Sequence, residues 1–333
     1  MIKAYAAFEP GGELKPFEYD PGPLLDDQVE IQVEHCGLCH SDLSMLNNEW
    51  GMTQYPFVPG HEIIGKVVAL GDRVKSLQLN QKVGLGWHSG YCQSCDACYS
   101  GDHNLCNTAQ GTIIAHHGGF AERVRAAESS VIPLPAGLDE STAGPLFCAG
   151  VTVFNPLLEL GIKPTDTVGV IGIGGLGHLA LQFLRAWGCE VWAFTSSEAK
   201  KAEALVLGAH HTVDSTDKKQ LKTLAGKFDL VLSTVNVKLD WNQYINTLSP
   251  KGKLHFVGAT LEPLDISVFP LMAGQRSVSS SPVGSPQALR KMLSFAKRHD
   301  ISPKVERFRF DQINEAIERL KSGKAHYRIV LSK

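Results

Sequence analysis

The chain has 333 residues, too many for one ordinary hydrophobic core, and this length fits two domains of common size. Apolar residues make up 43% of the sequence and charged residues 20%, and the formal net charge is −2, so the chain offers no field that would attract nucleic acid or an anionic membrane surface. The N-terminal residues lack the basic segment and apolar run of an export signal, and we expect a cytoplasmic protein.

The first 135 residues have the texture of a β-rich domain. Short apolar runs are cut by glycine and proline at close intervals, which is typical of a barrel-like arrangement of strands. The runs that predict strands cover residues 29–34, 63–70, 82–85 and 122–125.

From about Pro164 the pattern changes to alternating strands and helices, which predicts a doubly wound parallel sheet. Residues 168–188 are apolar enough to be mistaken for a membrane span, but interspersed glycines together with His178 and Arg185 favour a strand, a turn and a helix. The strands are expected at 167–173, 190–195, 229–234 and 253–258, and the helices at 178–187, 198–207 and 241–248.

The last part of the chain returns to a mixed texture. Amphipathic patterns predict helices over residues 286–298 and 311–322, followed by a closing strand over 328–331. We expect this tail to pack back on the first domain.

A cluster of cysteines is the strongest local signal. In a reducing compartment, clustered thiols bind metal more often than they form disulfides. Four thiolates at short spacing suit a tetrahedral zinc ion and leave no position for substrate, so the cluster predicts a structural zinc site; unliganded or disulfide-paired cysteines are the alternative. Its members are Cys92, Cys95, Cys98 and Cys106.

A second set of metal-ligating residues is dispersed along the chain. A catalytic zinc uses three protein ligands and keeps one exchangeable position, and thiolate and imidazole ligands from distant loops suit that task. Cys148 taken alone also fits an apolar core position. The set consists of Cys39 ahead of His40, Ser41 and Asp42, the run Gly60-His61-Glu62, and the isolated Cys148.

A glycine-rich turn follows the expected strand 167–173 and opens the next helix. In this context the glycines let the backbone approach a pyrophosphate at a helix N-terminus, which predicts a dinucleotide site. The residues of the turn are Gly172, Ile173, Gly174, Gly175, Leu176 and Gly177.

The end of the second strand indicates which dinucleotide binds. An NAD site places Asp or Glu there to accept from the ribose 2′-hydroxyl, and a carboxylate would repel the 2′-phosphate of NADP. Here hydroxyls and cations occur instead, which favours NADP(H); a solvated turn is the alternative. The residues are Thr195, Ser196, Ser197, Lys200 and Lys201.

In their order along the chain, these motifs resemble the zinc-dependent medium-chain dehydrogenase superfamily. The stretches 37–42 and 195–197 are similar to its cinnamyl alcohol dehydrogenase branch, and closest to the bacterial NADPH-dependent aldehyde reductases of that branch. The resemblance implies a GroES-like catalytic domain of residues 1–149 and 285–333, split and completed by the C-terminal tail, around a Rossmann domain of residues 150–284.

Residue by residue, the resemblance implies that Cys39, His61 and Cys148 hold a catalytic zinc, with Glu62 as a fourth or transient ligand. With the four-cysteine loop, this makes two zinc ions per chain.

The resemblance also implies that Asp42 orients His61 and that Ser41 starts a proton relay. In many relatives a histidine three residues after that hydroxyl passes the proton to solvent, but here the position is Ser44. Ser44 itself, a water molecule or the cofactor ribose is left to take its place.

The resemblance places Trp50, Met52 and Trp87 near a substrate pocket that favours apolar aldehydes, although ordinary core positions explain these residues as well. It also implies a homodimer, with an exposed sheet edge near Val278 paired across a two-fold axis. The sequence does not distinguish aliphatic, benzylic and cinnamyl substrates.

The expected function is zinc-dependent transfer of hydride between NADP(H) and a primary alcohol or aldehyde, with aldehyde reduction as the working direction. Two rival interpretations remain: an NAD-linked polyol dehydrogenase, and a zinc- and cofactor-binding regulator that has lost the chemistry. The missing acid after the second strand disfavours the first rival, and the complete set of zinc ligands disfavours the second.

Overall fold

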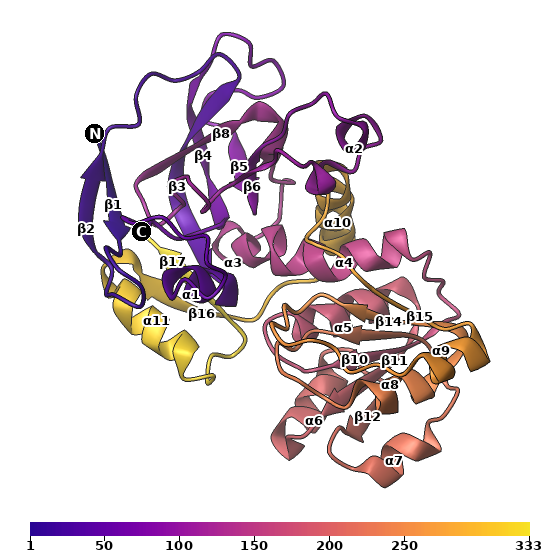
Figure 1. Ribbon diagram of the computed structural model, residues 1–333. Helices are drawn as coiled ribbons and strands as arrows, with labels where there is room; N and C mark the ends of the chain where they lie inside the picture. The colour runs from indigo at the N-terminus through magenta and orange to yellow at the C-terminus, as the bar shows by residue number, and fades with distance from the viewer. The chain divides into compact units, whose positions relative to one another are not determined.

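The structure is a computed structural model that describes residues Met1–Lys333, and it divides into two compact units (Figure 1). The first unit comprises Met1–Val151 and Gly284–Lys333, and the second comprises Thr152–Val283. The first is built mainly on antiparallel strands and the second on a parallel sheet, as the expected GroES-like and Rossmann classes require.

Strands dominate the first unit. Its strands are β1 Ile2–Ala6, β2 Lys15–Tyr19, β3 Gln28–Leu38, β4 Glu62–Leu70, β5 Lys82–Leu85, β6 His88–Gly90, β7 Gln110–Gly111, β8 Arg123–Ala127, β9 Val131–Pro133, β16 Val305–Arg309 and β17 Arg328–Ser332. Seven of them form one sheet in the order β16-β17-β3-β4-β5-β9, with β8 also paired to β3, while β1-β2 and β6-β7 form two small sheets.

The helices of the first unit are short, apart from one near the C-terminus. They are α1 His40–Leu46, α2 Asp96–Tyr99, α3 Glu140–Ala143, α10 Pro286–Arg298 and α11 Ile313–Lys321, with 3₁₀ turns η1 His103–Leu105, η2 Glu128–Ser130, η3 Gly144–Phe147 and η4 Phe310–Gln312. Because β17 pairs antiparallel with β3, the tail completes the sheet of the first unit, as the sequence predicts.

Helix α4, Ala149–Glu159, leads into the second unit. The elements of that unit are β10 Thr167–Ile171, α5 Gly177–Trp187, β11 Glu190–Thr195, α6 Glu198–Val206, β12 His211–Asp214, α7 Lys218–Thr223, β13 Phe228–Ser233, α8 Trp241–Thr247, β14 Leu248–Phe256, α9 Val268–Gly274 and β15 Ser277–Ser280. All strands run parallel, in the order β12-β11-β10-β13-β14-β15. This is the Rossmann order, in which a dinucleotide binds where the order reverses, beside the first strand.

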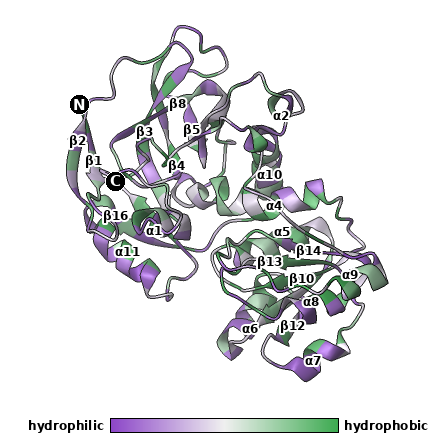
Figure 2. Ribbon diagram, in the orientation of Figure 1, coloured by the Kyte–Doolittle hydropathy of each residue, from purple (hydrophilic) through white to green (hydrophobic).

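Each unit has its own hydrophobic core. In the second unit, Phe194, Phe228 and Trp241 are buried between the sheet and its helices. Figure 2 shows strands β10, β13 and β14 as hydrophobic and helix α7 as largely hydrophilic. The fully apolar strands are those that parallel sheets bury on both faces.

The sequence patterns miss strands β12 and β16 and helix α7. Both strands are edges of their sheets, and each has few buried side chains, so neither shows an apolar run. Helix α7 is a short surface helix whose start depends on Asp217, which accepts the backbone N–H groups of Lys219 and Gln220.

No single helix is long and apolar enough to cross a membrane. One bent pair, Glu140–Phe147 with Ala149–Glu159, passes by length and composition, but all its residues from Ala143 to Leu157 are buried inside the protein. The stretch 168–188 forms a strand, a turn and a helix, as its glycines predict.

Candidate active site

Four buried residues of the first unit bring their ligand atoms within 4.8 Å of one another: Cys39, His61, Glu62 and Cys148. The Sγ atoms of Cys39 and Cys148 lie 3.9 Å apart, too far for a disulfide bond. That separation is close to the roughly 3.8 Å edge of a tetrahedron with metal–sulfur bonds of about 2.3 Å. The dispersed set predicted from the sequence therefore forms one cluster.

The backbone explains why these residues meet. Cys39 follows β3 and is the N-cap of α1, while His61 immediately precedes β4. In the β3–β4 ladder, Gly37 lies opposite Glu62. A Cβ atom at Gly37 would lie 1.9 Å from Glu62 Oε2, so only glycine leaves room for the carboxylate. Cys148 joins from the 3₁₀ turn η3, which packs against β3 and β4.

Asp42 fixes the positions of Cys39 and His61 through hydrogen bonds. Its Oδ2 accepts the Cys39 N–H at 2.9 Å, and its Oδ1 accepts the Gly60 N–H at 2.8 Å and lies 3.0 Å from His61 Nδ1. The other ring nitrogen of His61, Nε2, is buried and has no hydrogen-bond partner. An orphaned imidazole nitrogen beside two thiols fits a bound metal ion, since a buried polar atom is otherwise costly to leave unpaired.

The electrostatics of the cluster suit a cation. The hydrogen bond with the Cys148 thiol holds the pKa of Cys39 well below its usual value, although burial opposes this shift. Burial raises the pKa of Glu62 to about 7, against the opposing charge of Arg328. The site thus stabilises one thiolate, which is the metal-binding form of cysteine.

Arg328, on β17, is a member of the site that sequence reasoning missed. One of its guanidinium nitrogens donates to Glu62 Oε1, and the other lies 3.9 Å from Cys39 Sγ. The side chain is buried, and it comes from the C-terminal tail, 266 residues after Glu62. The only signal in the sequence is a cation opening an otherwise apolar strand.

The four-cysteine loop forms a second, separate cluster between β6 and β7. Its Sγ atoms also lie within 4.8 Å of one another, with 3.9 Å between Cys92 and Cys98 and 3.5 Å between Cys92 and Cys106. All eight cysteines are free, so the disulfide alternative is wrong. Four thiols at tetrahedral spacing, Cys95 included, fit a closed zinc shell.

Of the three expected pocket residues, Trp87 lies beside His61 and Trp50 lies beside Trp87. The ring of Trp87 contacts the His61 ring edge to face at 5.0 Å, and Trp50 lies 6.1 Å from Trp87. Met52, on the loop after Trp50, is exposed. Ser41 Oγ lies 3.8 Å from Cys39 Sγ, and the buried Ser44 accepts the backbone N–H of Glu49, a residue that sequence reasoning did not single out, with its carbonyl oxygen at 2.9 Å.

The glycine turn of the second unit has the geometry of a phosphate cradle. Gly172 adopts φ +86°, which favours glycine, and a Cβ atom at Gly177 would lie 1.9 Å from the Gly172 carbonyl oxygen. A Cβ atom at Gly174 would meet no atom within 4 Å, so open space lies against this backbone. Gly175 and Leu176 complete the turn into α5.

The serine turn after β11 presents hydroxyls at the N-terminus of α6. Ser197 is the N-cap, and its Oγ accepts the Lys200 N–H. Ser196 is exposed, and Thr195 Oγ1 accepts the Ser197 N–H at 3.3 Å. Lys201 pairs with Glu198 and lies 3.9 Å from Asp214, which turns its charge away from the turn.

Two family models match the chain. The alcohol dehydrogenase GroES-like domain covers residues 25–136, and the zinc-binding dehydrogenase domain covers residues 175–298.

Full-length relatives are also found. The chain is 64% identical over 332 residues to an aldehyde reductase of Synechocystis sp., which covers 100% of this chain and 99% of that protein. It is 40% identical over 335 residues to cinnamyl alcohol dehydrogenase 7 of Arabidopsis thaliana, covering 98% of this chain and 94% of that protein.

Solved structures share the fold. A cinnamyl alcohol dehydrogenase of Sorghum bicolor superposes with a TM-score of 0.95 at 34% identity, covering 99% of this chain and 97% of that one. The corresponding enzyme of Helicobacter pylori, in complex with NADP(H), gives 0.92 at 30% identity with the same coverage.

Alanine substitutions at Gly177 and Gly174 distinguish a glycine needed for packing from a glycine that leaves room for the dinucleotide. We expect Gly177→Ala to destabilise the protein by about 1–3 kcal/mol, because the new Cβ must displace backbone. Gly174→Ala leaves the unfolding temperature nearly unchanged but weakens dinucleotide binding, because its Cβ fills the open space where a pyrophosphate would approach. Thermal unfolding and cofactor titration test this; an unstable Gly174→Ala protein contradicts it.

Proposed function

This chain belongs to the zinc-binding medium-chain alcohol dehydrogenases, in the cinnamyl alcohol dehydrogenase branch, and from that premise we propose that it reduces apolar aldehydes with NADPH. Membership of this family makes the chain a zinc-dependent oxidoreductase of alcohols and aldehydes. The choice of NADPH, the roles of individual residues, two zinc ions per chain and a homodimer are our proposals.

The observation that carries the proposal is the orphaned Nε2 of His61. It faces a cluster with two thiols 3.9 Å apart, while the other ring nitrogen is fixed by Asp42. We assign Cys39, His61 and Cys148 as zinc ligands. Arg328 holds Oε1 of Glu62, while Oε2 is buried without a hydrogen-bond partner, so we assign Glu62 as a fourth or transient ligand that a substrate oxygen can replace.

A zinc ion here would polarise an aldehyde oxygen, and a reduced nicotinamide would supply hydride. The chain's own residues do the remaining work. Asp42 keeps the His61 ring in one orientation, and Ser41 supplies the proton to the developing alcohol. Trp87 beside His61, and Trp50 beside Trp87, offer apolar surface, which favours an uncharged, apolar aldehyde.

The direct test is a paired assay of the purified protein. Rates with NADPH and NADH are measured against aliphatic, benzylic and cinnamyl aldehydes and against a polyol, with zinc content determined on the same sample. We expect efficient reduction of apolar aldehydes with NADPH. Preference for the polyol with NAD, or no turnover of any substrate by zinc-loaded protein, would support the rival functions instead.

Metal content distinguishes the two clusters. We expect two zinc ions per chain in the wild type. Cys148→Ser should lose one zinc and nearly all turnover while keeping its fold, and Cys95→Ser should lose the other and unfold at lower temperature.

The matched control is Cys189→Ser, because Cys189 is buried outside both clusters. This variant should keep both ions. A fully active wild type with one zinc per chain would falsify the assignment.

Cofactor preference rests on the turn after β11. The exposed Ser196 hydroxyl, the Ser197 hydroxyl proton and the Lys200 ammonium are available to a 2′-phosphate, whereas Lys201 is engaged elsewhere. Hydrogen bonds to a charged group contribute roughly 1.5–3 kcal/mol each. Two such bonds, even at half strength, favour NADPH by about tenfold or more.

Ser196→Asp should raise the KM for NADPH far more than that for NADH, because the new carboxylate repels the 2′-phosphate, and it should leave zinc content unchanged. Ser267→Asp, at another exposed position of the second unit, is the control. A Ser196→Asp variant that keeps its NADPH preference contradicts the role of this turn.

The outer end of the proton relay is proposed to run through Ser44 to Glu49. Ser41 and Ser44 are three residues apart on α1 and so share a helix face. The Asn47 amide, and with it the nearby Ser44 hydroxyl, lowers the pKa of Glu49, which keeps this exposed carboxylate ionised as a link to solvent. Water or the cofactor ribose joins the two serine hydroxyls.

We expect Ser41→Ala to lower kcat by about a hundredfold or more. Ser44→Ala and Glu49→Gln should have smaller effects, and the double variant should be no slower than the slower single variant, because the two groups act in series. Asn47→Ala, which removes the other bond to Glu49, is the control. Additive losses in a double-mutant cycle would contradict a shared path.

A homodimer is proposed through the edge of the Rossmann sheet. Strand β15 is the outermost strand and leaves backbone groups unpaired by any further strand. Helix α9, just before it, exposes Val268 by 65%, Phe269 by 80% and Met272 by 70%. Large apolar side chains beside an open sheet edge support the proposal that a second copy of this chain covers the surface.

Light scattering at micromolar concentration should give a dimer. The Phe269→Asp, Met272→Asp double variant should be monomeric, because buried charge opposes the apolar contact, whereas Val206→Asp, at an equally exposed residue of α6, should remain dimeric. A monomeric wild type refutes the proposal.

A further inference from the structure

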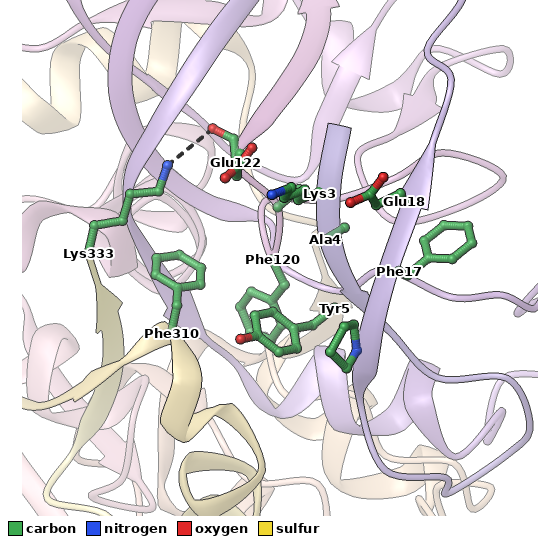
Figure 3. Close-up of a pocket in the computed structure, with 11 residues that line it drawn as sticks. Lys3, Ala4, Tyr5, Phe17, Glu18, Phe120, Glu122, Phe310 and Lys333 are labelled. Carbon is green, nitrogen blue, oxygen red and sulfur yellow. Dashed lines mark hydrogen bonds between the residues drawn. The ribbon is translucent and has the colours of Figure 1, made fainter. Parts of the chain in front are cut away.

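A cavity lies in the first unit, and none of its lining residues belongs to the metal cluster (Figure 3). Its volume is about 610 Å³, within the range of small-molecule sites. Its walls include the apolar side chains of Tyr5, Pro16 and Phe310, and Figure 3 shows Tyr5 and Phe310 below the charged side chains of Lys3 and Glu122. Charged residues at its rim determine which class of ligand it can bind.

The cavity is built from both ends of the chain. In the β1–β2 ladder Lys3 lies opposite Glu18 and Tyr5 opposite Pro16, so these four side chains share one face of the small sheet. The opposite wall comes from the loop 120–122, from Phe310 and from the last residue, Lys333. No sequence motif marks such a site, because its walls come from segments up to 330 residues apart.

The rim carries charges of both signs that form no contact ion pair with one another. Lys3 and Lys333 form no ion pair, and the Lys333 Nζ donates only to the backbone carbonyl oxygen of Glu122, at 3.4 Å. The carboxylates of Glu18 and Glu122 likewise form no ion pair. A purely anionic ligand would face the two carboxylates, and a purely cationic one would face the two ammonium groups.

We propose that this cavity binds a free amino acid with an aromatic or large apolar side chain. The α-carboxylate pairs with Lys3 and Lys333, the α-ammonium pairs with Glu122 or Glu18, and the side chain lies on Phe310 and Tyr5. A zwitterion is the class of ligand that meets both signs of charge at once.

The cavity is connected to the metal cluster through Phe120. The Phe120 N–H donates to the Pro59 carbonyl at 2.9 Å, and a Cβ atom placed on Gly60 would lie 2.7 Å from the Phe120 ring. Gly60 in turn donates to Asp42 and precedes His61. Because the ring of Phe120 is buried, an occupant lies against its backbone, which is hydrogen-bonded to the turn that positions a zinc ligand, and we expect it to change kcat.

Calorimetric titration of the full-length, zinc-loaded protein tests the site without cofactor or aldehyde. L-Phenylalanine should bind, while phenylacetate, phenethylamine and L-alanine, which lack the ammonium, the carboxylate and the ring, should each bind at least about tenfold more weakly. Equal binding of phenylacetate, or no binding of L-phenylalanine, overturns the proposal. Neither outcome affects the proposed aldehyde reduction, which is measured separately.

Variants locate the binding. Lys3→Met, Glu122→Gln and Phe310→Ala change residues at or near the surface and should each weaken L-phenylalanine binding about tenfold or more. Val206→Ala, at an exposed side chain of the second unit outside the proposed dimer interface, should bind as the wild type does. Wild-type affinity in Phe310→Ala overturns the location.

The link to the metal site is tested by turnover. Saturating L-phenylalanine should change the kcat for aldehyde reduction in the wild type and not in Phe310→Ala. Unchanged kcat despite confirmed binding overturns the link.

Discussion

One buried carboxylate fixes the geometry on which the catalytic cluster depends. Asp42 accepts the N–H groups of Cys39 and Gly60 and holds Nδ1 of His61, and so ties the start of α1 to the turn before β4. A buried charge costs several kcal/mol unless donors surround it, and here three donors do so. Because the same atoms set the ring orientation of His61, stability and ligand geometry have a common origin in this residue.

The sequence reveals most where the chemistry is local. The four cysteines of the loop between β6 and β7 lie within one short segment, and the glycines of the turn after β10 have their roles fixed by spacing alone, so both patterns are legible without any tertiary structure. The dispersed ligands are different. Cys148 alone is indistinguishable from a core cysteine, and only the resemblance to a family identified it before the structure placed its thiol beside Cys39.

What the sequence could not provide depends on contacts between distant segments. Arg328 reaches Glu62 only because β17 pairs with β3, a pairing between the two ends of the chain. The contact of Ser44 with Glu49 depends on how the chain turns after α1. Strands β12 and β16 escaped notice because edge strands bury few side chains and lack the apolar run that marks central ones.

The charges of the cluster also bear on which molecules it accepts. With both thiols ionised, Cys39, Cys148, Glu62 and Asp42 carry four negative charges against the single positive charge of Arg328. A divalent cation would reduce this buried excess from three units to one, and so would favour ionisation of the second thiol when the metal binds. An uncharged oxygen ligand in the remaining position leaves that balance unchanged. A carboxylate would add a further negative charge in a dry site, so the electrostatics favour an aldehyde or alcohol over the corresponding acid.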